Sequence, residues 1–463
     1  MKHIHCVGIG GIGISAIARV LLEQGYRVSG SDLRSSAEAL ALADAGATVY
    51  VGHDAANLGA ADTVLISSAI PASNPEVVAA MQRGLPVLKR AEFLGRLMDR
   101  RRRGTQAGIA VAGTHGKTTT TSMIVSILNR AELDPTFIVG GVIPSLNTNA
   151  RAGSGPHFVI EADEYDHMFL GLHPMVAAIT HLEHDHPDCF PTMRDMEAAF
   201  DQFVDRVPPD GLIVGCADQP AVAALLDRVR RRSATSVLTA GLGAGHDWRA
   251  VDLEVNALGG YSFAVFHGGE LWGSVELESP GVHNVQNALL ALIVADHLGV
   301  RRKEICDALA SFGGAKRRFE MVGQAGGVTV IDDYGHHPTE IRATLQAARA
   351  RYGERPVWAV FQPHTYSRIA ALWDDFCTAF GDADHVIVLD VYAAREKETL
   401  GVSAEVLAEQ IKHPDVRHVS GLENAARVVV ERIEPDAVVI TFSAGDGNQV
   451  GLHVLAQIEE RSN

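Results

Sequence analysis

An apolar strand that runs into a glycine-rich turn and then into a helix is the strongest constraint on this fold. Residues 109–118 read Ile-Ala-Val-Ala-Gly-Thr-His-Gly-Lys-Thr, and a helical stretch follows from about Thr119 to Arg130. This order of elements presents backbone N–H groups to phosphate oxygens. The sequence therefore predicts a nucleotide-phosphate site in a parallel α/β domain.

Two side chains of the loop have expected roles in that site. Lys117 is placed to reach the β- and γ-phosphates, and the Thr118 hydroxyl is placed to help hold Mg²⁺. The strict phosphate-loop pattern requires glycine where Val111 stands, so this chain departs from it by one residue. A plain glycine turn is the alternative interpretation.

The chain is too long for a single core. Its 463 residues predict two to four domains, and strand-like runs alternate with helical stretches throughout, which indicates parallel α/β sheets. We expect three domains, at residues 1–104, 105–314 and 315–463. The basic run 99–104 is interpreted as a linker, and the alternating stretch 253–277 predicts antiparallel hairpins packed beside the central sheet.

Composition narrows the possible functions. With 40 Lys and Arg against 56 Asp and Glu, the formal net charge is −16, which argues against nucleic-acid binding because that needs a basic face. The five cysteines are odd in number and form no Cys-x-x-Cys pair, as expected in a reducing compartment. Neither a signal-peptide pattern nor a membrane-spanning apolar run is recognisable. We therefore expect a cytoplasmic protein with no membrane partner.

Two acidic motifs follow apolar strands of the central segment. Residues 161–166 (Glu-Ala-Asp-Glu-Tyr-Asp) place carboxylates where a parallel sheet faces its ligand, and such oxygens suit Mg²⁺. An acidic first helical turn is the alternative. Residues 181–188 hold three His and three carboxylates, which also fits zinc. A Mg²⁺–nucleotide site fits better beside a phosphate loop, and ordinary polar packing is expected for any one histidine taken alone.

The two ends of the chain carry further candidates. Gly8-x-Gly10-x-x-Gly13 lies between a strand and a helix, with Asp32 ending the next strand, which is the pattern of a dinucleotide site. An NAD-dependent oxidoreductase is the corresponding alternative function, although it leaves the second phosphate loop unexplained. The third segment contains arginines and paired histidines that suit a carboxylate or a transferring phosphoryl group.

Taken together, the motifs resemble those of the Mur ligase family over nearly the whole chain. The matching residues are Gly8–Gly13, Ser67–Ile70, Arg90–Glu92, Gly113–Thr120, Glu161–Glu164, Asp185–His186, His283–Asn284, Arg317–Phe319 and Asp332–Glu340. The resemblance implies a Rossmann-like N-terminal domain for a UDP-sugar and a central P-loop ATPase-type α/β domain for ATP and Mg²⁺. A Rossmann-like C-terminal α/β domain would face the amino acid and close over both. A monomer or dimer is expected.

The resemblance also implies the site residues. The catalytic set is Lys117, Glu161, His186 and Arg318. The ATP-binding set is Gly113, Thr114, His115, Gly116, Lys117, Thr118, Thr119, His283, Asn284, Asn287, Arg318 and Asp333. The metal ligands are Thr118, Glu161 and His186. The UDP-sugar set is Gly8, Gly10, Gly11, Gly13, Ser15, Asp32 and Ser68. The substrate end is His337, His364 and Arg368.

Within the family, the resemblance points to members that join L-alanine to the lactyl carboxylate of UDP-N-acetylmuramate through an acyl phosphate. Members acting later usually carry a carbamylated lysine after the Asp-His motif, whereas no lysine occurs here between Lys117 and Lys303. The residues Glu164–Asp166 instead resemble a recycling ligase that attaches the tripeptide L-Ala-D-Glu-diaminopimelate. Residues 334–337 and 362–364 resemble the alanine-adding members and carry more weight. A non-catalytic nucleotide-binding switch is the remaining alternative.

Overall fold

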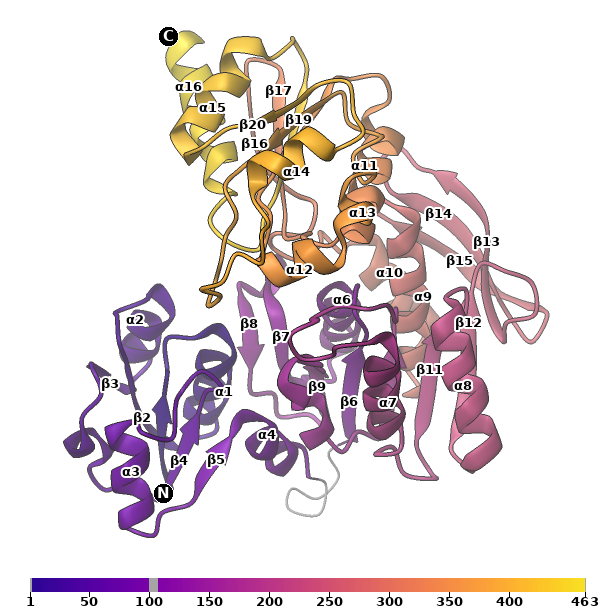
Figure 1. Ribbon diagram of the computed structural model, residues 1–463. Coiled ribbons are helices and arrows are strands. Elements are labelled where there is room, and N and C mark those ends of the chain that lie inside the picture. The colour runs from indigo at the N-terminus through magenta and orange to yellow at the C-terminus, as the bar shows by residue number, and fades with distance from the viewer. Residues whose placement is uncertain (1, 100–106, 463) are drawn as a thin grey trace.

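The structure, a computed structural model, describes residues 2–99 and 107–462. Three sheets follow one another along the chain, and each is flanked by helices (Figure 1). The predicted fold class, three α/β units, is confirmed. The domain limits 1–104, 105–314 and 315–463 remain predictions, and the first limit and most of the expected linker 99–104 lie outside the described residues.

The N-terminal sheet is five-stranded and entirely parallel, in the order β3-β2-β1-β4-β5. Its strands are β1 (His3–Val7), β2 (Arg27–Asp32), β3 (Thr48–Val51), β4 (Thr63–Ile66) and β5 (Val87–Lys89). The accompanying helices are α1 (Ile12–Glu23), α2 (Ala37–Asp44), η1 (Ala55–Leu58), α3 (Pro75–Gln82) and α4 (Arg90–Met98). Strand order reverses beside β1, so the turn after β1 lies at the point where open α/β sheets bind ligands.

The central sheet has ten strands, in the order β15-β14-β13-β12-β11-β10-β6-β9-β7-β8. The strands are β6 (Ala107–Ala112), β7 (Thr136–Ile143), β8 (Thr148–Arg151), β9 (His157–Glu161), β10 (Val176–Ile179), β11 (Leu212–Cys216), β12 (Ser236–Gly241), β13 (Trp248–Val255), β14 (Tyr261–His267) and β15 (Glu270–Leu277). The helices are α6 (Lys117–Arg130), η2 (Pro144–Leu146), η3 (Tyr165–Gly171), α7 (Met193–Val204), α8 (Pro220–Arg232), α9 (Val282–His297) and α10 (Arg302–Ala310).

The expected antiparallel hairpins are present, but their placement beside the sheet was wrong. Strand β13 pairs in parallel with β12, and β14 and β15 then add in antiparallel fashion, so the hairpins extend the central sheet (Figure 1). Trp248 begins this extension and is 2 % exposed. Edge pairing with β12 satisfies backbone groups that a separate hairpin layer would leave open.

The third sheet has six strands in the order β16-β17-β21-β18-β19-β20, and only the edge strand β16 is antiparallel. Its strands are β16 (Glu320–Ala325), β17 (Val328–Asp333), β18 (Val357–Phe361), β19 (His385–Val388), β20 (Val416–His418) and β21 (Val438–Phe442). The helices are α11 (Pro338–Tyr352), α12 (Tyr366–Ala371), α13 (Trp373–Phe376), α14 (Ala404–Gln410), α15 (Leu422–Arg432) and α16 (Gln449–Ser462).

Packing places the functional loops at one junction. Helices α6 and α9 lie on the same face of the central sheet and share one apolar core, with α10 beside them. The third unit lies over the end of the central sheet where α6 begins, with α11 and α12 directed toward it (Figure 1). Among the described residues, no helix is long and apolar enough to cross a bilayer.

The central core gives a direct test of the packing. Leu226 of α8 is fully buried, whereas Leu271 of β15 is 59 % exposed. Leu226→Ala should destabilise the protein by about 2–5 kcal/mol because it leaves a cavity, and Leu271→Ala should change stability by less than about 0.5 kcal/mol. Thermal unfolding of both variants measures the difference, and equal melting temperatures would contradict the assigned core.

Candidate active site

The phosphate loop links β6 to α6, and its shape depends on a glycine. Gly116 has φ of 78°, and a Cβ there would lie 2.5 Å from Oδ1 of Asn287 on α9. A side chain at this position would therefore be strained and would collide with a buried residue. Helix α6 begins at Lys117, so its free N–H groups open toward the loop, as the sequence predicted.

Lys117 is held in place by a buried carboxylate. Its Nζ lies 2.8 Å from Oε1 of Glu164 and 2.5 Å from the carbonyl oxygen of Gly113. Burial lowers the pKa of Lys117, but the carboxylates of Glu164 and Glu161 outweigh burial and raise it, so the side chain is a cation. A fixed positive charge at a helix N-terminus is suited to a nucleotide polyphosphate.

Glu161 and Thr118 bring two oxygen ligands together beside this lysine. The Thr118 hydroxyl donates to Oε1 of Glu161 at 3.1 Å, and the backbone N–H of Gly140 donates to Oε2 at 2.7 Å. Close by, Oε2 of Glu164 is buried with no hydrogen-bond partner among the described residues. Paired oxygen donors with an unsatisfied carboxylate oxygen nearby suit a hard cation such as Mg²⁺.

The third predicted metal ligand, His186, lies near the same carboxylate oxygen of Glu164 that Lys117 contacts. Its Nε2 is 3.7 Å from Oε1 of Glu164 and 3.6 Å from Oδ2 of Asp185. Glu164 therefore lies within reach of both Lys117 and His186. Sequence analysis placed Glu164 in a motif but gave it no role, because its burial next to Lys117 is visible only in the folded structure.

A buried ion pair joins the central and third units. Arg368 of α12 is 3 % exposed, and its Nε lies 2.9 Å from Oδ1 of Asp185, which is also 3 % exposed. Burial raises the pKa of Asp185, but Arg368 and the neighbouring histidines together outweigh burial and hold this pKa well below its usual range. Nη1 of Arg368 also lies 3.0 Å from Nδ1 of His364. Two predicted substrate-end residues are thus tied to the central unit.

A second contact between these units runs through His115 of the phosphate loop. Its Nε2 makes a short contact with Oε1 of Glu183, and its Nδ1 lies 3.1 Å from Oε1 of Glu340 on α11. His337, which caps α11, places its Nδ1 3.1 Å from Glu183, and Arg318 lies 3.6 Å from Glu340. Neither Glu183 nor Glu340 was given a role from the sequence, because His115, which contacts both, lies more than 60 residues from each.

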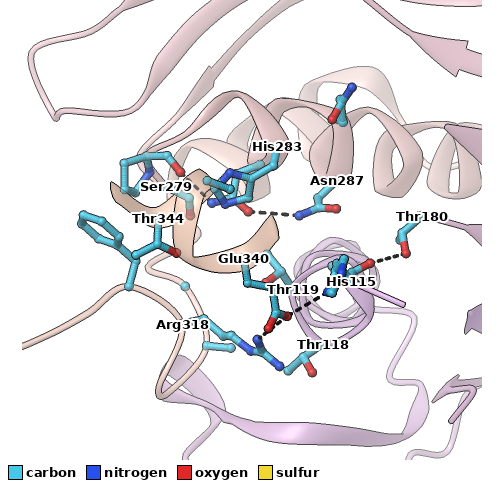
Figure 2. A pocket seen from close by; sticks show the side chains of 18 of the residues that line it. His115, Thr118, Thr119, Thr180, Ser279, His283, Asn287, Arg318, Glu340 and Thr344 are labelled. Carbon is cyan, nitrogen blue, oxygen red and sulfur yellow. Dashed lines mark hydrogen bonds and ion pairs between the residues drawn. The ribbon is translucent and has the colours of Figure 1, made fainter. Parts of the chain in front are cut away.

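These contacts surround a cavity of about 310 Å³ between the two units. Figure 2 shows His115, Thr118, Thr119, His283, Asn287 and Arg318 around one space, with Glu340 and Thr344 contributed by α11. Asn284 and Asp333 also line it, so the predicted nucleotide residues from α6, α9 and the third unit converge. Burial raises the pKa of Asp333 to about 6, although Arg318 opposes the shift.

The N-terminal glycine motif forms a separate site at the carboxyl edge of the first sheet. Gly10 donates its N–H to Oδ2 of Asp32 at 2.9 Å, so the Asp32 carboxylate is used to shape the turn. A Cβ at Gly13 would lie 2.2 Å from Nη1 of Arg90, and Arg90 is 2.6 Å from Oδ2 of Asp163. Arg90 thus connects this turn to the central acidic motif.

The remaining residues of the predicted UDP-sugar set differ in exposure. Gly8 and Ser15 lie within the turn and the first helical turn, and the Ser15 hydroxyl donates to the carbonyl oxygen of Ile12 at 3.0 Å. Gly11 and Ser68 are exposed. The roles proposed for this set remain predictions.

Comparisons with known proteins agree with this architecture. Three family models match in order: the Mur ligase family catalytic domain at residues 3–102, the Mur ligase middle domain at 111–295 and the Mur ligase glutamate ligase domain at 317–445. A UDP-N-acetylmuramate–L-alanine ligase of Geobacter sp. (strain M21) is 44 % identical over 99 % of this chain and 98 % of its own length. The chain belongs to the Mur ligase family. It is therefore an ATP-dependent ligase, as the motifs predicted.

Other relatives of this Mur ligase include both kinds of enzyme that the sequence resembled. A UDP-N-acetylmuramate–L-alanine ligase of Acidithiobacillus ferrooxidans is 46 % identical over 96 % of this chain and 95 % of its own. The crystal structure of the Thermotoga maritima UDP-N-acetylmuramate-alanine ligase matches with a TM-score of 0.81 and 27 % identity, over the whole of both chains. A murein peptide ligase of Psychrobacter arcticus matches with a TM-score of 0.72 and 26 % identity over 99 % of each chain.

The contact of His115 with Glu183 predicts a defined pH dependence. Burial lowers the pKa of His115, but Glu340 and Glu183 together outweigh burial and raise this pKa to about 10. Burial raises the pKa of Glu183, but mainly His115, through its hydrogen bond and charge, lowers this pKa to about 2. The raised pKa of His115 contributes stability that is fully present below pH 6.5, and this stability is lost as the pH rises through 10. The lowered pKa of Glu183 contributes stability that is fully present above pH 4.5, and this stability is lost as the pH falls through 2.

Glu183→Gln should therefore cost about 1–3 kcal/mol between roughly pH 4.5 and 6.5 and progressively less toward pH 10. Thermal unfolding across this range measures the difference from the parent protein. Glu276→Gln, at an exposed position of β15, is the matched control and should show no such profile. A penalty for Glu183→Gln that does not vary with pH would contradict the assignment.

Proposed function

We propose that this Mur ligase joins L-alanine to the lactyl carboxylate of UDP-N-acetylmuramate, with ATP as the energy source. The observation that carries the proposal is a cavity between the central and third units that is lined by His115, Thr118 and Arg318. Glu161 accepts a hydrogen bond from Thr118 at 3.1 Å, and Lys117 precedes Thr118 in the phosphate loop. Relatives named for this activity, 44 % and 46 % identical over nearly the full chain, support it.

The first chemical step is phosphoryl transfer from ATP to the substrate carboxylate. Both reactants are anions, so the barrier falls when fixed cations neutralise the charge that develops between them. Lys117 supplies one such charge from the phosphate loop, and Arg318 supplies another from the third unit. The N–H groups at the start of α6 hold the phosphates in line. ADP leaves, and the sugar substrate carries an acyl phosphate.

Mg²⁺ fits the oxygen donors of Thr118 and Glu161, where it would supply positive charge to the β- and γ-phosphates. We propose His186 as a more distant member of the same set, because its ring faces Glu164. Glu164 acts on Lys117 directly and holds its ammonium group toward the loop. This assigns Glu164 a positioning role that the sequence motifs did not reveal.

The second step is attack of the alanine amine on the acyl phosphate, with release of phosphate and formation of the amide. The amine must lose a proton, and neutral histidines of the third unit are available to accept it. Burial lowers the pKa of His364 to about 4 and holds that of His336 well below 6.5, with Arg368 contributing in both cases. Because Arg368 and His337 are buried and paired, we propose that they position the substrate end without touching the substrate.

We propose that the UDP-sugar binds the glycine turn after β1, where the N-terminus of α1 faces its diphosphate. In this proposal the sugar substrate binds the first unit and directs its lactyl carboxylate toward Lys117. The five cysteines are all free thiols, which supports a reducing compartment, and we propose a cytoplasmic enzyme acting as a monomer or dimer.

A recycling ligase that attaches a tripeptide is the second candidate. It is favoured by Tyr165 in the acidic motif and by the murein peptide ligases among the similar structures, one of them from Neisseria, 34 % identical over 68 % of this chain. The Tyr165 hydroxyl donates to Oδ2 of Asp188 at 2.9 Å, and Arg395 of the third unit lies over its ring, so this motif contacts the unit that we propose to face the acceptor.

A substrate panel separates the two candidates. With ATP, Mg²⁺ and UDP-N-acetylmuramate, phosphate release should depend on L-alanine, with Gly and L-Ser as weaker acceptors. Coupled phosphate assays give kcat/KM for each acceptor. Equal or better turnover with L-Ala-D-Glu-diaminopimelate would overturn the alanine assignment, and release independent of any amino acid would indicate a nucleotide switch instead.

The proposed role of Lys117 is tested by Lys117→Met, which keeps the aliphatic stem and removes the charge. Ligation should fall by at least about 10²–10³-fold, because a preorganised charge at the transferring phosphate is lost. Lys303→Met, whose side chain is 84 % exposed on α10, is the matched control and should retain full activity. An active Lys117→Met enzyme would exclude this phosphate loop as the catalytic one.

A further inference from the structure

Two histidines and one carboxylate meet where the phosphate loop lies against the end of β10. Ligand atoms of His115, His181 and Glu183 all lie within 4.8 Å of one another. The rings of His115 and His181 have centroids 5.2 Å apart, and His115 already touches Glu183. None of these three belongs to the proposed Mg²⁺ set of Thr118, Glu161 and His186.

Surrounding groups fix the orientation of each ligand. Nδ1 of His115 faces Glu340 at 3.1 Å, so its Nε2 is the nitrogen directed at Glu183. Nδ1 of His181 is 3.2 Å from the Thr114 hydroxyl, which leaves the other ring nitrogen for an ion. Ligating histidines in protein metal sites typically donate their second ring N–H to an acceptor such as a carboxylate, which is the arrangement of His115 with Glu340.

The carboxylate is supported as well. Oε2 of Glu183 accepts from the Thr339 hydroxyl at 3.1 Å, and Oε1 lies 3.1 Å from Nδ1 of His337. His337 is 3 % exposed, and its Nε2 has no hydrogen-bond partner among the described residues. The three ligands therefore lie in a shell of oriented donors and acceptors drawn from both the central and third units.

The chemistry of this donor set selects a class of ion. Two imidazole nitrogens and one carboxylate oxygen are typical zinc ligands, whereas Mg²⁺ prefers oxygen alone. Tetrahedral zinc with bonds of about 2.0 Å needs ligand atoms roughly 3.3 Å apart. The three groups must therefore draw together from the observed spacing of up to 4.8 Å to hold the ion. Zinc would replace the proton that Nε2 of His115 shares with Glu183, and that proton passes to solvent.

We propose that His115, His181 and Glu183 form a binding site for one divalent transition-metal ion of the zinc class, distinct from the Mg²⁺ ligands. Because His115 and His181 also line the nucleotide cavity, an ion there would occupy space beside the phosphate loop. The inference does not depend on which amino acid the ligase uses, since it concerns binding to the nucleotide-free enzyme.

The test is zinc affinity of the full-length, nucleotide-free protein, measured by competition with a chromophoric zinc indicator. We expect one tight ion per chain and at least about tenfold weaker binding in His181→Ala and in Glu183→Gln. His184→Ala is the matched control, because His184 lies in the same segment but bonds the carbonyl oxygen of Phe190. Its affinity should stay within about twofold of the parent protein.

A second control separates this site from the Mg²⁺ ligands. Glu161→Gln should leave zinc affinity unchanged, and Co²⁺ added to the parent protein should give the visible absorption of a four-coordinate ion with nitrogen ligands. Unchanged affinity in both His181→Ala and Glu183→Gln overturns the proposal, as does loss of the ion in Glu161→Gln or His184→Ala. Thermal unfolding checks that each variant is folded. If His181→Ala does not fold, the zinc affinity of Glu183→Gln alone decides the test.

Discussion

Carboxylates at the ends of β9 and β10 must each be matched by a cation, and the rest of the site depends on this requirement. Glu164 is buried against Lys117 and Asp185 against Arg368, and the partly buried Glu183 pairs with His115. Removing one partner from a buried pair typically costs about 3–5 kcal/mol, because the other charge is left without compensation. Each pair therefore fixes the segment that supplies its cation.

The three pairs have different consequences for the enzyme. The pair of Glu164 with Lys117 positions a charge for the phosphates. The pair of Asp185 with Arg368 joins α12 of the third unit to the loop after β10, and His115 adds a contact from the phosphate loop to Glu340 on α11. The nucleotide cavity is thus built from two units that are held together by charge at its rim.

Sheet topology explains why these groups meet. Strands β9, β6 and β10 are adjacent and parallel, so their carboxyl ends lie side by side and carry the acidic motif, the phosphate loop and the His-rich motif in turn. Motifs separated by many residues in the chain become neighbours because parallel strands end at one edge. The same arrangement brings His115 to His181 and Glu183, where the proposed zinc site lies.

The sequence by itself determined the fold class, the phosphate loop, the acidic and His-rich motifs and the family, since each is local: a strand, a turn and a few side chains at fixed spacing. The start of a helix is predicted less accurately, because the polar residues of a first turn give no apolar periodicity. Helix α6 begins at Lys117, two residues before the expected Thr119. Only the tertiary structure decided the partners of these motifs. The pairing of β13 with β12, the burial of Glu164 and Arg368, and the contacts of Glu183 and Glu340 with His115 all join residues distant in sequence. Long-range charge pairing depends on how the units pack, so no local sequence pattern predicts it.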